Sequence, residues 1–207
     1  MHGVEIDVVA VFDVSSQYLA TMISEGHKNV KWIHVFSTGI NSQSSKTLLE
    51  HPAPITRGKG AFADSLAEFI MFGILYIEKR YSEYLKVNKE HKWLVGKDRI
   101  FVGMMRDKTL GIVGYGDIAI ECARMAKHGF KTRIFALKRD PSSVTEEGKE
   151  LADEIVGLDG LDRLLAESDY VLNVLPLTAE TENLFGAKEF AKMKKDSIYA
   201  NIGRGGT

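Results

Sequence analysis

The stretch GIVGYGDIA, residues 111–119, lies between an apolar segment with the pattern of a strand and a segment with the pattern of a helix. Gly114 permits a tight turn there, and Gly116 has no side chain to keep a phosphorylated ligand away from the main chain. The helix opens with Asp117 and Ile118, and the amides and dipole of a helix N-terminus attract anions. This GxGxxA spacing therefore predicts a turn that binds the diphosphate of a dinucleotide.

Short apolar segments and helical patterns alternate on both sides of this turn. Strict alternation of this kind is typical of a parallel sheet that is covered by helices on both faces. The sequence thus predicts an α/β fold with a doubly wound, parallel Rossmann-type sheet. Its expected strands are Thr109–Val113, Thr132–Leu137, Glu154–Val156, Tyr170–Val174 and Ser197–Ile202.

The N-terminal part of the chain has a second, shorter α/β pattern. Ile6–Phe12 and Lys31–Phe36 are expected strands, whereas His51–Gly60 contains two prolines and two glycines and is expected to be linker or loop. Apolar residues then recur at helical spacing over Phe62–Asn88, which predicts one long connecting helix. We expect two domains: a partial second α/β domain over 1–61, and the connecting helix with the dinucleotide-binding domain over 62–207.

The composition is that of a folded protein and excludes several classes of function. Of 207 residues, 44% are hydrophobic and 27% are charged, and the net charge of −1 gives no electrostatic argument for binding nucleic acid or acidic membranes. The longest apolar runs, such as Val8–Phe12, are far shorter than the roughly 18 residues that cross a bilayer. Cys122 is the only cysteine, so we expect no disulfide framework, no metal site and a cytoplasmic protein.

The choice of cofactor should depend on the residues that follow the second strand of the sheet. In dinucleotide-binding sheets that take NAD, an acidic side chain at that place accepts from the ribose 2′-hydroxyl. In this sequence the first residue after the strand is Lys138, and Arg139 comes next. Two cations would attract a 2′-phosphate, so the sequence slightly favours NADP(H) over NAD(H). The alternative is that both cations are solvated and that Asp140 takes the acidic role.

Several motifs, in the same order, resemble one known family, the D-isomer-specific 2-hydroxyacid dehydrogenases. The resemblance covers nearly the whole chain and is strongest to members of the glyoxylate/hydroxypyruvate reductase type. It implies an NAD(P)-dependent oxidoreductase that transfers a hydride between a nicotinamide cofactor and a small 2-oxo or 2-hydroxy acid. The matching segments are Ser37–Asn41, Gly60–Phe69, Lys108–Ala119, Leu161–Thr178, Glu180–Phe185 and Ser197–Gly205.

The resemblance also implies a substrate site. The residue that matches Arg204 binds the carboxylate and keto oxygen of the substrate, which makes it the candidate catalytic residue, and a guanidinium suits that role because it donates two parallel hydrogen bonds. Thr38, Gly39 and Ile40 match a second carboxylate cradle that is made of main-chain amides. The alternatives are that Arg204 is a surface arginine and that Gly39 belongs to an ordinary turn.

Further residues are assigned to the cofactor by the same resemblance. Leu175, Pro176 and Thr181 match positions on the adenine side, while Ile202 and Gly203 end the last expected strand beside the cofactor. Pro176 has a simpler interpretation as the residue that terminates a strand.

The resemblance leaves two classes of function open. Family members continue past Arg204 with an acidic residue and a histidine that protonates the substrate oxygen, whereas this sequence ends at Thr207, and its start is also shorter than usual. We therefore expect the chain to bind NADPH and to lack the proton donor. The alternative function is a non-catalytic dinucleotide-binding scaffold. Because family members pair through the region of Phe62–Asn88, a homodimer is expected for the full-length protein. The alternative is that this segment is a hinge helix buried within one chain.

Overall fold

The computed structural model describes residues 6–11, 29–37 and 50–207. The chain divides into two compact units, Met1–Phe62 and Ala63–Thr207. Within the described residues no helix is long and apolar enough to cross a membrane. The cytoplasmic location stays a prediction.

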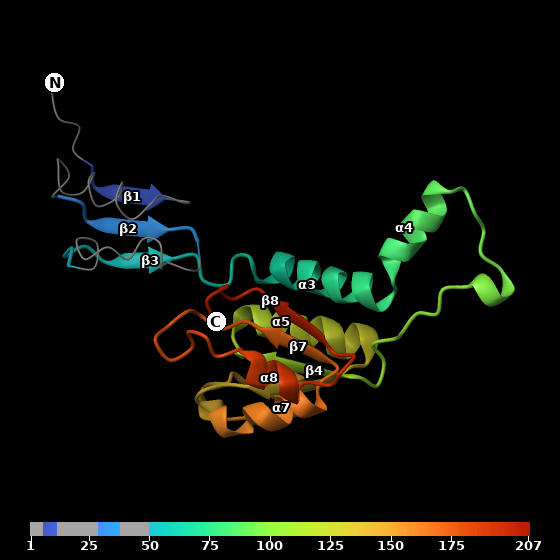
Figure 1. The fold of residues 1–207 in the computed structure, drawn as a ribbon. Helices are drawn as coiled ribbons and strands as arrows, with labels where there is room; N and C mark the ends of the chain where they lie inside the picture. The colour runs from blue at the N-terminus through green and yellow to red at the C-terminus, as the bar shows by residue number, and fades with distance from the viewer. Residues whose placement is uncertain (1–5, 12–28, 38–49) are drawn as a thin grey trace. The chain divides into compact units, whose positions relative to one another are not determined.

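The first unit contains a small parallel sheet (Figure 1). Its strands β1 (Val8–Val11), β2 (Trp32–Val35) and β3 (Ile55–Arg57) lie in that order. Val9 and Ile33 are buried on one face of this sheet and form the centre of its core. The two expected N-terminal strands are therefore present, within slightly shorter bounds.

The third strand corrects the expectation that His51–Gly60 is only linker or loop, because β3 lies inside that segment. Pro54 directly precedes the strand, and its carbonyl oxygen accepts from the amide nitrogen of Ile33 at 3.1 Å. A proline has no N–H to donate, but this one stands before an edge strand, where the missing donor leaves the sheet intact. Because prolines are rare inside strands, the sequence did not predict the strand that begins directly after Pro54.

The second unit is built on a five-stranded parallel sheet with the strand order β6-β5-β4-β7-β8. This order is that of a doubly wound sheet, in which the connections turn in opposite directions on the two sides of the first strand, β4. The α/β fold prediction is confirmed. The strands are β4 (Thr109–Val113), β5 (Arg133–Leu137), β6 (Glu154–Val156), β7 (Tyr170–Asn173) and β8 (Ile198–Asn201).

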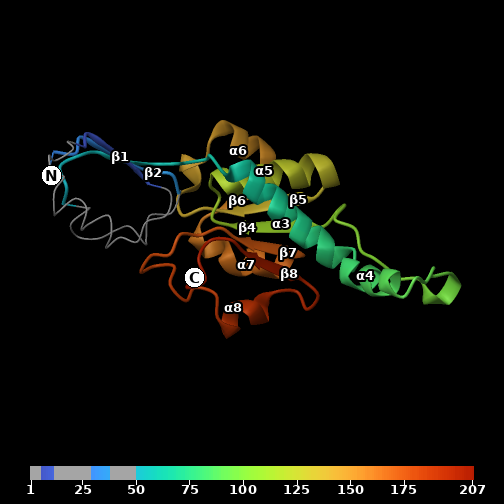
Figure 2. The ribbon, with the colours of Figure 1, turned by 90° about the horizontal axis from the view of Figure 1, so that it is seen from above.

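Helices cover both faces of this sheet, as Figure 1 shows for α3 and α5 on one side and α7 on the other. In Figure 2, α3 runs across the strands beside α5. Side chains alternate along the strands: Ile112 packs with the α3 and α5 face, and Val113 packs with the α7 face. The helices are α3 (Ala63–Glu78), α5 (Asp117–Arg124), α6 (Glu146–Leu151), α7 (Leu161–Glu167) and α8 (Ala187–Lys192).

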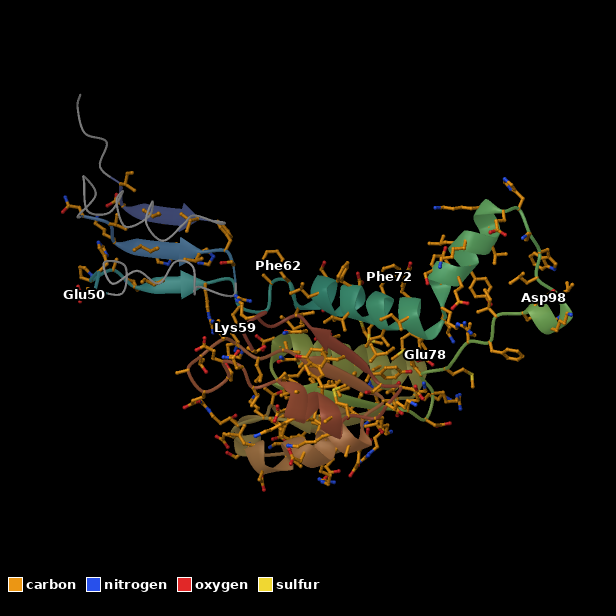
Figure 3. All side chains as sticks on the ribbon, in the orientation of Figure 1. Glu50, Lys59, Phe62, Phe72, Glu78 and Asp98 are labelled. Atoms are coloured by element: carbon orange, nitrogen blue, oxygen red, sulfur yellow. The ribbon has the colours of Figure 1, made fainter. Side chains whose placement is uncertain are left out.

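The prediction of one unbroken helix over Phe62–Asn88 is wrong, because the segment forms two helices, α3 and α4 (Tyr81–Lys89). The chain turns at Arg80, which has a left-handed backbone with φ 49°. There the ammonium of Lys79 donates to the carbonyl of Gly103 at 2.6 Å, which holds the end of α3 against a later segment. Figure 3 labels Glu78, the last residue of α3, beside this break. The helical spacing of apolar residues does not reveal such a turn.

Candidate functional site

A cavity of about 470 Å³ lies at the carboxyl ends of β4, β5 and β7. In a doubly wound sheet this is the edge where ligands bind, at the point where the strand order reverses. The cavity brings together most of the residues that the sequence assigned to a cofactor. These are Gly114, Gly116, Lys138, Arg139, Leu175, Pro176 and Thr181.

The glycine turn after β4 has the geometry that the motif predicts. Gly114 has φ 97°, and a Cβ atom there would lie 3.2 Å from the amide nitrogen of Leu175, so only glycine fits without strain. A Cβ atom on Gly116 would instead meet no described atom within 4 Å, and Gly116 lines the cavity. The turn therefore leaves open space beside its main chain, which fits a diphosphate.

Helix α5 begins directly after this turn, with Asp117 and Ile118 in its first turn. Neither residue is among those that line the cavity, so their role in cofactor binding stays a prediction. The N-terminus of a helix carries a partial positive charge, which complements a diphosphate. Any cofactor contact of these two residues is thus expected from their amides.

Tyr115, between the two glycines, is a residue that the sequence analysis did not single out. Its side chain is buried, and its hydroxyl donates to the carbonyl of Gly148 in α6 at 3.0 Å. Burial raises the pKa of this phenol to about 12, so it remains a donor. The contact joins the glycine turn to a helix 33 residues further along the chain, and nothing in the motif signals it.

The end of β5 presents two cations to the cavity. Lys138 and Arg139 line it, and Arg139 Nη1 donates to Glu180 Oε2 at 3.1 Å. Asp140 does not line the cavity, and its carboxylate accepts from the hydroxyl of Ser142 at 2.6 Å and from the amide of Ser142 at 3.0 Å. These hydrogen bonds lower the pKa of Asp140 below its usual value. The alternative acidic residue is therefore engaged in its own turn.

The loop after β7 forms the opposite wall, with Leu175 and Pro176 lining the cavity. The hydroxyl of Thr181 donates to the carbonyl of Pro176 at 2.5 Å and accepts from the amide of Thr178 at 2.9 Å. Thr181, which the resemblance assigns to the adenine side of the cofactor, therefore uses its hydroxyl to hold the loop in shape.

Three residues at the end of β8 lie outside the cavity lining. The amide of Ile202 donates to the carbonyl of Asn173 at 3.1 Å. A Cβ atom on Gly203 would lie 2.3 Å from the carbonyl oxygen of Leu175, so this close approach also requires glycine. Arg204 follows with an exposed side chain, whose Nη1 donates to the carbonyl of Gly203 at 2.8 Å. The loop after β8 and the loop after β7 are therefore packed together here.

Asn173, at the end of β7, is another residue that the sequence analysis missed. It is fully buried, and its Nδ2 donates to the hydroxyl of Tyr199 at 2.9 Å and to that of Thr207 at 2.8 Å. Its Oδ1 accepts from the amide of Leu175 at 3.1 Å. The only signal in the sequence is a polar residue inside an otherwise apolar strand.

The remaining predicted site residues, Thr38, Gly39 and Ile40, lie outside the described residues. Their role as a carboxylate cradle stays a prediction. In the part of the chain that the structure describes, no group of three or more His, Cys, Asp or Glu side chains could hold a metal ion.

Comparison with known proteins agrees with this geometry. Residues 71–207 match the family model described as "D-isomer specific 2-hydroxyacid dehydrogenase, NAD binding domain". Glyoxylate/hydroxypyruvate reductase B from Cronobacter sakazakii is 32% identical over 205 residues, which are 97% of this chain and 57% of that protein. The chain thus spans about half the length of the curated relatives that it matches.

Two solved structures have the same arrangement of strands and helices. The apo form of D-mandelate dehydrogenase from Rhodotorula graminis superposes with a TM-score of 0.81 at 24% identity, covering 98% of this chain and 61% of that one. A glyoxylate reductase from Paecilomyes thermophila gives a TM-score of 0.79 at 26% identity, covering 97% and 60%. The resemblance found in the sequence is confirmed: this chain belongs to the D-isomer specific 2-hydroxyacid dehydrogenase family, and its residues 71–207 match that family's NAD-binding domain.

Proposed function

We propose that the protein transfers a hydride between a nicotinamide dinucleotide and a small 2-oxo or 2-hydroxy acid such as glyoxylate or hydroxypyruvate. The observation that carries this proposal is the open side of Gly116, which faces a cavity between a basic loop and an apolar one. The turn and the start of α5 would hold the diphosphate, and Leu175 and Pro176 would pack on the adenosine half. A bound nicotinamide supplies or accepts the hydride.

Arg204 is the proposed catalytic residue, in contact with the substrate. Its exposed guanidinium would clamp the carboxylate through two parallel hydrogen bonds and polarise the neighbouring carbonyl. Its carbonyl oxygen accepts from the hydroxyl of Thr207 at 2.7 Å and from Asn201 Nδ2 at 3.1 Å, so its main chain is anchored. Its guanidinium is exposed and donates to the carbonyl of Gly203, a contact that a substrate carboxylate would replace. We propose residues 1–61 as part of the substrate-binding domain, with the amides of Thr38, Gly39 and Ile40 as a second carboxylate cradle.

Binding of a substrate mimic tests the role of Arg204. Oxamate has the planar carboxylate and carbonyl of a small 2-oxo acid, and we expect it to bind the protein–NADPH complex and to change the fluorescence of the bound nicotinamide. Arg204→Gln should weaken oxamate at least about tenfold, as expected for the loss of a bidentate charge pair, while Arg106→Gln serves as the control. Dinucleotide binding without any oxamate binding would favour the non-catalytic scaffold.

For the cofactor we propose NADP(H) in preference to NAD(H). Lys138 and Arg139 line the cavity, and the carboxylate of Asp140 is occupied by Ser142. In calorimetric titrations NADPH should bind more tightly than NADH, and Lys138→Asp should weaken NADPH by about tenfold or more through loss of one cation and gain of one anion. Lys195→Asp is the matched control on the exposed surface. A wild-type protein that binds neither dinucleotide would overturn the proposed function.

We also propose that a second copy of the chain covers α4 and the segment that follows it. Trp93 and Phe101 are 89% and 81% exposed there, and a hollow of about 550 Å³ lies between α4 and residues 92–100. Figure 3 shows Phe72 of α3 pointing away from the sheet, and it too is exposed. Large exposed apolar surfaces mark interaction sites. Light scattering should give the mass of a dimer, and Trp93→Ser with Phe101→Ser should give a monomer.

A further inference from the structure

The ion pair of Arg139 and Glu180 joins two loops that are far apart in the sequence. Arg139 follows β5 and Glu180 follows β7, and these strands flank β4 on opposite sides. Both residues line the cavity, and their side chains are 76% and 73% exposed. The pair therefore links the two sides of the site next to the glycine turn.

Glu180 gives this site a negative charge opposite its cations. Among the described residues that line the cavity, Lys138 and Arg139 are the cations and Glu180 is the only carboxylate. A 2′-phosphate that entered between the cations would meet this carboxylate as a repelling neighbour and as a competitor for the Arg139 guanidinium. A ribose with a free 2′-hydroxyl carries no charge there and leaves the ion pair intact.

The loop that carries Glu180 is held in place by its own hydrogen bonds. The amides of Thr181 and Glu182 both donate to the carbonyl of Thr178, at 3.1 and 2.9 Å. The hydroxyl of Thr181 adds its contact with the carbonyl of Pro176. Because the main chain on both sides of Glu180 is fixed in this way, its carboxylate stays within reach of Arg139. An ion pair this exposed is weak, so Arg139 can still exchange one anionic partner for another.

We propose that Glu180 is a specificity-determining residue, which lowers the preference for NADPH over NADH by competing with the ribose 2′-phosphate for Arg139. This inference rests on the proposed dinucleotide site and concerns the affinity for the phosphate, not the hydride transfer. The Arg139 guanidinium can pair with either the carboxylate of Glu180 or the 2′-phosphate of a bound cofactor.

The test compares Glu180→Gln with Glu182→Gln by calorimetric titration of NADPH and NADH at low salt. Both substitutions remove one negative charge from the same loop, but Glu182 does not line the cavity. We expect Glu180→Gln to tighten NADPH about threefold to fivefold, the size of one charge interaction at an exposed site, and to change NADH less than about twofold. Glu182→Gln should change neither affinity by more than about twofold. Equal effects of the two variants would overturn the inference.

A double-mutant cycle shows whether the effect passes through Arg139. In an Arg139→Gln background the gain from Glu180→Gln should fall to less than about half, because no guanidinium remains to be released. A gain that persists in full would show that Glu180 acts only as a distant charge, and this would overturn the competition mechanism. Titration with 2′,5′-ADP against 5′-ADP should reproduce the difference without a nicotinamide.

The two proposals fail in distinguishable ways. If the wild-type protein binds neither NADPH nor NADH, the proposed function fails, and this inference fails with it. If both dinucleotides bind and Glu180→Gln behaves like Glu182→Gln, only the role of Glu180 is refuted.

Discussion

The side-chain amide of Asn173 donates to the hydroxyl of Thr207 at 2.8 Å, 34 residues further along the chain. The same hydroxyl donates to the carbonyl of Arg204, so the end of β7 is tied through Thr207 to the loop that carries the proposed substrate-binding arginine. Asn173 also accepts from the amide of Leu175, which lines the cavity. One buried side chain thus positions both the cofactor loop and the substrate loop.

Replacement of Asn173 by alanine should destabilise the second unit. The substitution leaves the part-buried amide of Leu175 and hydroxyl of Tyr199 without their partner, which costs about 2–3 kcal/mol in the free energy of unfolding. Urea unfolding followed by circular dichroism measures this change. Asn88→Ala, on the exposed surface of α4, is the control and should change the value by less than about 0.5 kcal/mol. An equal effect of both variants would refute the positioning role of Asn173.

The two glycines of the turn should respond differently to alanine. Gly116 has a φ of −116°, which alanine adopts freely, and its Cβ would point into open space, so Gly116→Ala should keep the stability of the wild type. The added methyl group takes the place of the diphosphate, and NADPH affinity should fall at least about tenfold. Gly114→Ala forces a left-handed backbone on a residue with a Cβ and should cost about 1–3 kcal/mol in stability as well. Unchanged NADPH binding by Gly116→Ala would place the diphosphate elsewhere.

Stability should decrease in acid because of a charge cluster at the amino ends of β5 and β6. The hydrogen bond from Arg163 holds the pKa of Glu154 below its usual value, and the one from Arg133 does the same for Glu167. A folded-state pKa below the unfolded value, about 4.3 for glutamate, stabilises the fold above that pH, and the contribution is lost as pH falls through the folded pKa. The urea midpoint should therefore fall below about pH 4.5. The urea midpoint of Arg163→Gln should decrease less in acid than that of the wild type. The control Lys195→Gln should show the same decrease as the wild type.

Cys122 should be inert in the folded protein. Its side chain is fully buried, and burial raises the pKa of its thiol to about 12. At pH 8 only about one thiol in ten thousand is then ionised, and the thiolate is the reactive form. Ellman's reagent should label the native protein at least about a thousandfold more slowly than the protein in guanidinium chloride. Rapid labelling of the native protein would show that α5 opens far more often than its packing indicates.

The parts of the fold that the sequence predicts well are those with a local cause. The glycine turn follows from the chemistry of two residues, and the five strands of the second unit follow from short apolar segments between helices. The expected bounds of Thr109–Val113 and Glu154–Val156 agree with β4 and β6. The strand after Pro54 and the turn at Arg80 were missed because each depends on a partner elsewhere, Ile33 for the strand and Gly103 for the turn.

The same distinction holds for the candidate site. The motifs and the resemblance point to Gly114, Gly116 and Lys138, which the cavity brings together. They give no sign that Glu180 pairs with Arg139 across 41 residues, because such a contact exists only after the sheet has formed. Thr181 is a related case: the motif marks the position, but only the structure shows that its hydroxyl is already bonded to Pro176.

The contact between Tyr115 and Gly148 has a consequence for affinity. Since the hydroxyl of Tyr115 anchors the glycine turn to α6 and stays protonated far above neutral pH, the turn has already lost its conformational freedom before any ligand arrives. Preorganisation of this kind lowers the entropic cost of association. Tyr115→Phe, which keeps the ring and removes only the hydroxyl, should therefore weaken dinucleotide binding by loosening the main chain of the turn.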